Sequence, residues 1–92
     1  MEGVRPYRVV LTRSAQRFVE GADAPLQRRL RRAFDMLRAR PRDHPNATRL
    51  KGEFAGHYRF RVGDYRVLYC IHQEQQTVEV VTIAHRREAY RP

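Results

Sequence analysis

The sequence predicts an α+β fold in which a two-helix hairpin packs on one face of a small, mainly antiparallel four-stranded sheet, in the order β-α-α-β-β-β. Apolar residues recur at helical spacing in the N-terminal half, whereas β-branched and aromatic residues alternate with polar ones in the C-terminal half. The length of 92 residues allows one modest core. We therefore expect a single domain over residues 1–92, with the second face of the sheet uncovered.

A strand followed by a helix is expected at the N-terminus. The range Tyr7–Leu11 is β-prone, and Thr12 or Ser14 then offers a hydroxyl oxygen that can cap a helix start. The apolar residues of this helix recur at helical spacing, at Ala15, Phe18, Val19 and Ala22. Gly21 and Pro25 predict a break before a second helix.

The second helix is predicted over Ala24–Arg40. Its apolar residues fall on one stripe, formed by Leu26, Leu30, Ala33, Phe34 and Leu37. Its arginines lie mostly off that stripe, at Arg28, Arg29, Arg31, Arg32 and Arg38. One face therefore packs on the core, and the other is cationic, either as a solvated face or as a binding face. Pro41 and Pro45 end the helix, and a polar loop is expected through Asn46.

Three strands are expected in the C-terminal half. The first, Tyr58–Val62, alternates apolar residues with Arg59 and Arg61 at a period of two. Gly63-Asp64 is a turn signal that joins it to the second strand, Tyr65–Ile71, which is apolar on both faces and so belongs in the centre of the sheet. Polar residues 72–76 turn into the last strand, over 77–84, and a basic tail follows.

The charge favours a polyanionic partner. Nineteen basic residues face ten acidic ones, for a net charge of +9, and all the basic residues except Lys51 are arginines. Guanidinium groups bind phosphates bidentately and stack on bases, although a GC-rich genome would also enrich arginine. No stretch approaches the ~20 apolar residues of a membrane span, and no signal peptide is evident, so we expect a cytoplasmic protein without a membrane partner. Cys70 stands alone and no zinc-site spacing occurs, so we expect no metal and no cofactor.

A candidate site for phosphodiester chemistry lies in the strand region. A meander would gather six residues at one side of the sheet: Arg59, Arg61, Arg66, His85, Arg86 and Tyr90. Cleavage without a metal needs cationic donors that stabilise charge on phosphorus, and proton carriers for the attacking 2′-hydroxyl and the leaving 5′-oxygen. Each residue alone also fits a surface or packing role, but the combination favours catalysis. Glu53, Glu79 and Glu88 are further proton-acceptor candidates that periodicity does not bring to the arginine face.

Several runs of residues resemble the RelE/ParE toxin superfamily. They are Tyr7–Thr12 with Ser14-Ala15, Leu50-Lys51-Gly52, the run from Tyr58 to Tyr69, and Ile83–Tyr90. The most specific parts are Tyr-Arg-Phe-Arg-Val-Gly-Asp-Tyr-Arg at 58–66 and the His-Arg-x-x-x-Tyr ending at 85–90. The resemblance implies a RelE-like fold and a type II toxin that enters the ribosomal A site and cuts messenger RNA through 2′-hydroxyl attack.

The resemblance also implies roles for single residues. Arg59 and Arg61 match two basic strand residues that stabilise charge, and Arg66 matches the arginine that holds the scissile phosphate. Arg86 matches the basic residue after the last strand, and Tyr90 the tyrosine that stacks on the nucleotide or joins proton transfer. His85 fits a histidine of many members and is the preferred general acid; some relatives carry a glutamate base where this chain has Ala47 and Thr48.

The resemblance further implies binding surfaces and partners. We expect Lys51, Arg28, Arg29, Arg32 and Arg87 to bind RNA or the ribosome. The partners would be messenger RNA, the 16S ribosomal RNA and a RelB-like antitoxin, whose acidic or disordered segment would be attracted by the basic surface. Two alternatives remain: a ParE-like toxin without a nuclease site that poisons DNA gyrase, and a plain nucleic-acid-binding module.

Overall fold

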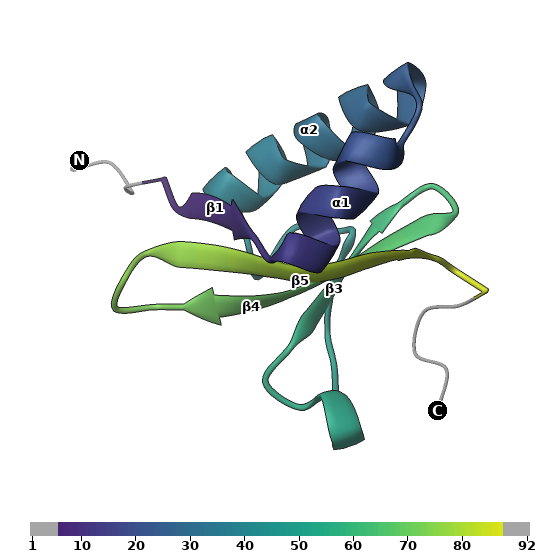
Figure 1. Cartoon of the computed structure of the whole chain (residues 1–92). Helices are drawn as coiled ribbons and strands as arrows, with labels where there is room; N and C mark the ends of the chain where they lie inside the picture. The colour runs from purple at the N-terminus through teal and green to yellow at the C-terminus, as the bar shows by residue number, and fades with distance from the viewer. Residues whose placement is uncertain (1–5, 88–92) are drawn as a thin grey trace.

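The computed structural model describes residues 6–87, in which two helices cover one face of a mixed five-stranded sheet (Figure 1). The strands are β1 (Arg8–Leu11), β2 (Ala47–Arg49), β3 (Tyr58–Val62), β4 (Tyr65–His72) and β5 (Thr77–His85). The helices are α1 (Arg13–Gly21), α2 (Ala24–Ala39) and the short 3-10 helix η1 (Gly52–Phe54). The sheet order is β1-β5-β4-β3-β2; β1 runs parallel to β5 and all other pairs are antiparallel. The predicted α+β class and the central place of β4 are confirmed.

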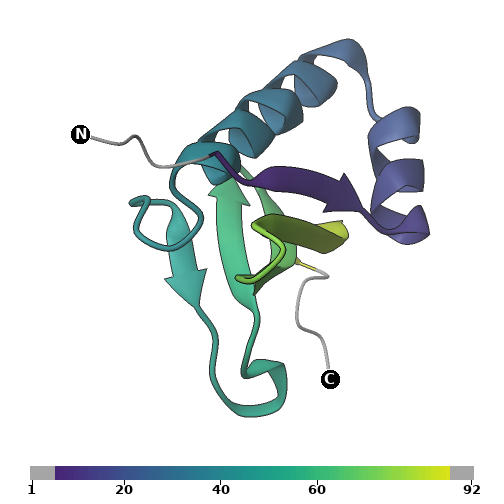
Figure 2. The same ribbon diagram turned by 90° about the vertical axis from the view of Figure 1, so that its left-hand side faces the viewer.

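The predicted count of four strands is wrong, because the expected polar loop after α2 contains β2. This strand has three residues and pairs with β3 at the edge of the sheet, where Figure 2 shows it far from β1. Ala-Thr-Arg is too short to show a period of two, and a free edge of a neighbouring strand is enough to align so short a segment. The element order is therefore β-α-α-β-β-β-β, with η1 in the loop between β2 and β3.

Side-chain caps fix where both helices begin. The Thr12 hydroxyl accepts a hydrogen bond from the Ala15 amide at 3.2 Å and donates one to the Val81 carbonyl at 2.6 Å, which ties the start of α1 to β5. The Asp23 carboxylate accepts from the Leu26 amide at 3.0 Å and caps α2. Both caps follow the preference for oxygen-bearing side chains at this position. Neither helix of the described part is long and apolar enough to cross a membrane.

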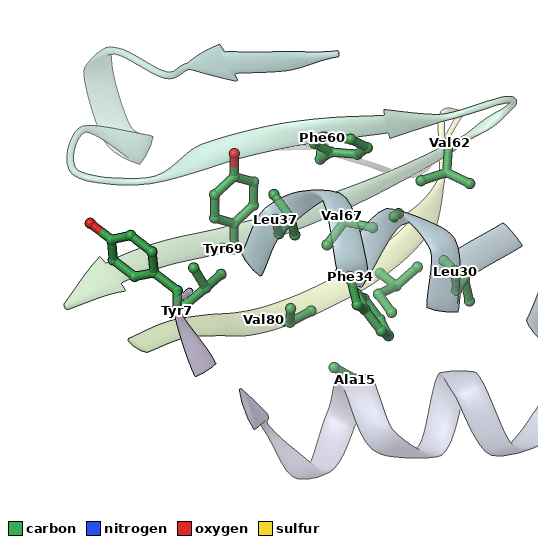
Figure 3. Close-up of a cluster of buried hydrophobic side chains, with 13 residues drawn as sticks. Tyr7, Ala15, Leu30, Phe34, Leu37, Phe60, Val62, Val67, Tyr69 and Val80 are labelled. Atoms are coloured by element: carbon green, nitrogen blue, oxygen red, sulfur yellow. The ribbon is translucent and has the colours of Figure 1, made fainter. Parts of the chain in front are cut away.

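The core lies between the helices and the sheet (Figure 3). The buried residues of α2 are Leu30, Ala33, Phe34 and Leu37, at the predicted helical spacing. They meet Phe60 of β3 and Val67 and Tyr69 of β4, all at most 1% exposed. The Tyr69 hydroxyl donates to the Pro41 carbonyl at 2.6 Å, so its one polar group is satisfied inside the core. Burial also raises the pKa of the Tyr69 phenol above its ordinary value.

A β-bulge in β5 decides which of its residues face the core. Leu68 pairs with Thr82, whereas the next residue, Tyr69, pairs with Val80, so Val81 has no partner on β4. The extra residue shifts the alternation of inward and outward side chains by one position. As a result Val80 and Ile83 are both buried on the helix side, although they lie three residues apart.

Candidate functional site

The sheet face opposite the helices, here called the open face, carries a basic hollow of about 300 Å³. We call it the arginine hollow; its lining residues are Pro45, Asn46, Thr48, Arg59, Arg61 and Arg66. Strand register explains the grouping, because Arg61 pairs with Arg66 and Thr48 pairs with Arg59. Directly paired residues project on the same side of a sheet, and Phe60 between the two β3 arginines is buried on the other side.

Backbone contacts hold the arginines of this hollow in place. The Asn46 carbonyl accepts from the Arg61 amide at 3.0 Å, and the Asn46 side-chain amide donates to the Arg61 carbonyl at 3.2 Å. Nη1 of Arg66 donates to the carbonyls of Gly63 and Tyr65 at 2.9 and 3.0 Å. Sequence reasoning missed Asn46 and Thr48, which it assigned to a polar loop; the sequence offered no signal for them, because their place beside β3 depends on the short strand β2.

The lining of the arginine hollow suits a phosphodiester. Among the described residues, no carboxylate lines it, and its three arginines supply guanidinium cations. Like charges gathered in this way repel one another, and a bound anion relieves that repulsion. Guanidinium groups also match the geometry of phosphate oxygens. The hollow can therefore bind a phosphate and stabilise additional negative charge on it.

Arg86 reaches the turn that also holds Arg66. Its backbone amide donates to the Asp64 carbonyl at 2.7 Å, and its Nε lies 3.9 Å from the Asp64 carboxylate. Asp64 belongs to the β3–β4 turn, whose neighbouring carbonyls accept from Arg66. The structure thus brings Arg86 to the same end of the sheet as Arg66. Tyr90 and Glu88 lie outside the described residues.

His85 does not join the arginines, contrary to the expectation that the meander gathers it with them. It pairs with Tyr65 on the helix side of the sheet, and the two rings lie 5.4 Å apart in an edge-on arrangement. There it lines a separate hollow with Phe18 of α1 and Asp23 at the start of α2. The physical reason is the β-bulge at Val81. Side chains alternate between the two faces of a strand, so without the extra residue His85 would lie on the open face.

Of the acidic candidates, Glu79 does lie on the open face, but at the far end of it. It pairs with Cys70 and its carboxylate lies 2.9 Å from Nε2 of His72. Cys70 is four positions along β4 from Arg66, which is roughly 13 Å at about 3.3 Å per residue. Glu79 therefore stands away from the arginine hollow, as part of a His–Glu pair that the sequence did not reveal. Glu53 lies in η1, in the loop that projects away from the helices (Figure 1).

The expected RNA-binding residues are spread over three places. Lys51 is exposed at the start of the η1 loop, and Arg87 is exposed just after β5. Arg28 is exposed on α2. Arg29 and Arg32 of α2, by contrast, line a second hollow that adjoins the arginine hollow and shares two residues with it.

Comparison with a known family covers most of the chain. Residues 9–90 match the profile of a family described as the ParE toxin of the type II toxin–antitoxin system, parDE. No curated protein sequence matches the chain significantly.

Several solved structures share the fold. A chain of the RelBE2 toxin–antitoxin complex from Mycobacterium tuberculosis is 29% identical, with a TM-score of 0.78 over 96% of this chain and 100% of that one. A chain of the archaeal RelE–RelB complex from Pyrococcus horikoshii is 25% identical, with a TM-score of 0.77 over 91% and 99%. A chain of the intact RelBE complex from E. coli is 18% identical and, at a TM-score of 0.73 over 86% and 95%, shares the fold.

Proposed function

We propose that this chain, which belongs to the ParE toxin family of type II toxin–antitoxin systems within the RelE/ParE superfamily, is a ribosome-dependent endonuclease that cuts messenger RNA. The arginine hollow carries the proposal, because it offers three guanidinium groups to a phosphodiester on the open face of the sheet. In the proposed reaction the 2′-oxygen attacks phosphorus and the bond from phosphorus to the 5′-oxygen breaks. A 2′,3′-cyclic phosphate and a free 5′-hydroxyl result.

The role proposed for each arginine follows from its positive charge. Arg66 holds the scissile phosphate, while Arg59 and Arg61 stabilise the negative charge that grows as phosphorus becomes pentavalent. Arg86, held at the same turn, adds a further positive charge. Tyr90 is proposed to stack on a nucleotide or to take part in the transfer of the proton that leaves the 2′-hydroxyl and the proton that reaches the 5′-oxygen.

We also propose the partners that such a toxin needs. Messenger RNA and the 16S ribosomal RNA would meet the basic surface, with Lys51, Arg28 and Arg87 as contacts outside the hollow. A RelB-like antitoxin with an acidic or disordered segment would neutralise the net charge of +9. The structural relatives from M. tuberculosis and P. horikoshii were solved as a RelBE2 toxin–antitoxin complex and a RelE–RelB complex, respectively. The ribosomal target makes the cytoplasm the proposed location.

Primer extension on a defined messenger RNA tests the proposed activity. Purified protein is incubated with the RNA in the presence and in the absence of programmed ribosomes. We expect cuts within the A-site codon that require ribosomes, because the proposed role of the ribosome is to hold the RNA in the geometry for 2′-oxygen attack. A toxic preparation that yields no cuts in either condition would contradict the proposal.

One observation favours a second candidate function. The matching family profile is named for ParE rather than RelE, which supports the alternative of a gyrase poison that shares the fold but cleaves no RNA. In that case the arginine hollow would be a binding surface. Covalent complexes of gyrase with cleaved DNA would accumulate in intoxicated cells, and messenger RNA would remain intact.

His85→Ala is expected to retain messenger-RNA cleavage within a few-fold of the wild-type rate. The reason for this expectation is that His85 lies on the helix side of the sheet and lines a separate hollow from the one that we assign to the scissile phosphate. Single-turnover cleavage on programmed ribosomes measures the effect, with a thermal melt to check folding. A decrease as large as that caused by removing an arginine from the hollow would restore His85 as the general acid.

A further inference from the structure

We propose that a second hollow, between α2 and the outer end of β3, binds the phosphate adjacent to the one in the arginine hollow. One single-stranded polynucleotide would then cross the edge of the sheet from the open face onto α2. We call this second site the edge hollow; it has a volume of about 190 Å³ and is bordered by Arg29, Arg32, Met36, Asn46, Arg61 and Gly63. The inference rests on the proposed function, which assigns the first phosphate to the arginine hollow.

The two hollows are continuous because the edge strand is short. β2 pairs with β3 only as far as Phe60, and beyond that point the backbone of Arg61 is bordered by Asn46. Asn46 and Arg61 line both hollows, one on each side of the sheet edge. An anion bound in either hollow would therefore contact Arg61. Two consecutive phosphates of one polynucleotide, one in each hollow, would both contact it.

Gly63 shapes the edge hollow by admitting Arg29. A Cβ atom at position 63 would lie 1.8 Å from Nη2 of Arg29, and the residue has φ +58°, a conformation that favours glycine. The guanidinium of Arg29 thus lies against the β3–β4 turn and lines the same hollow as Arg61. Arg29 and Gly63 are 34 positions apart in the sequence. Their close approach brings an arginine of α2 to the hollow that Arg61 of β3 also lines.

The charge and the apolar lining of the edge hollow suit a nucleotide better than a bare anion. Among the described residues, no carboxylate lines it, and Arg29, Arg32 and Arg61 take part in no ion pair. Met36, which follows Arg32 by four positions on α2 and is 36% exposed, adds an apolar side chain to the lining. Cationic groups beside an apolar surface match a phosphate joined to a sugar and a base.

The test measures binding separately from cleavage. The probe is a short fluorescent 2′-O-methyl oligoribonucleotide, which cannot undergo 2′-oxygen attack, and its Kd is measured by anisotropy over a series of salt concentrations. Arg29→Gln and Arg32→Gln are each expected to weaken binding severalfold. Each should also flatten the slope of log Kd against log salt by about 0.7 for each phosphate that the variant no longer binds. Arg31→Gln is the matched control, since it removes the same charge from the other side of α2.

Two results would overturn the inference. In the first, Arg29→Gln and Arg32→Gln bind the oligonucleotide with the same salt dependence as Arg31→Gln, so that only net charge matters. In the second, they lose affinity for a polyglutamate peptide but not for the oligonucleotide, which would assign the edge hollow to an acidic protein segment. Ribosome-dependent cleavage by the wild-type protein remains a separate readout, so a failure of the edge hollow leaves the proposed nuclease activity standing.

Discussion

Arg66→Ala is expected to lower the rate of messenger-RNA cleavage by about 10²–10³-fold, the usual decrease when a donor to transition-state charge is removed. The guanidinium stands in the arginine hollow with Arg59 and Arg61, and alanine leaves the phosphate with one cation fewer. Folding should be retained, because the Arg66 side chain donates its hydrogen bonds to turn carbonyls at the surface of the sheet. Single-turnover cleavage on programmed ribosomes measures the rate, and growth after induction measures toxicity.

Arg8→Ala is the matched control for this experiment. Arg8 is an exposed arginine on the open face of β1, paired with Thr77 and away from the hollow, so cleavage should stay near the wild-type rate. Unchanged growth arrest by Arg66→Ala would count against the nuclease mechanism. Accumulation of gyrase bound to cleaved DNA in the same cells would establish the ParE-like alternative instead.

Leu37→Ala is expected to lower the free energy of unfolding by about 2–5 kcal/mol, a large part of the 5–15 kcal/mol typical of a small domain. Leu37 is fully buried where α2 meets the sheet, so truncation leaves a cavity that the neighbouring side chains of β3 and β4 fill only in part. Urea unfolding followed by circular dichroism measures the change.

Met36→Ala provides the comparison, because it is the preceding residue of the same helix and is 36% exposed. We expect it to cost well under half as much as Leu37→Ala. Equal decreases in the free energy of unfolding for the two variants would mean that burial of Leu37 against the sheet does not set the stability at this part of α2, because alanine favours the helix at both positions.

The sequence predicted the elements whose residues follow a clear period. The apolar stripe of α2 and the alternation around Phe60 in β3 both hold in the structure, because burial of one face enforces them. β2 could not be predicted in this way. Its three residues carry no periodic signal, and its pairing depends on the free edge of β3.

The candidate site was predicted in part for a related reason. Arg59, Arg61 and Arg66 meet because a two-residue turn fixes the register between their strands. His85 was misplaced because a single extra residue in β5 reverses which side its later residues face. The adjacent apolar residues Val80 and Val81 were the available sign of a bulge, since strict alternation would have made one of them polar.

The parallel pairing of β1 with β5 has a consequence for the order in which this protein folds. The hydroxyl of Thr12 reaches the Val81 carbonyl, 69 positions later in the chain, and β1 lies against β5 along its length. During synthesis β1 therefore cannot pair with β5 until β5 has left the ribosomal exit tunnel. Contacts between residues so distant in sequence also form slowly. Arg59, Arg61 and Arg66 lie on β3 and β4, and β4 gains its second neighbour only when β5 joins the sheet, so the sheet beneath the arginines is completed late in folding.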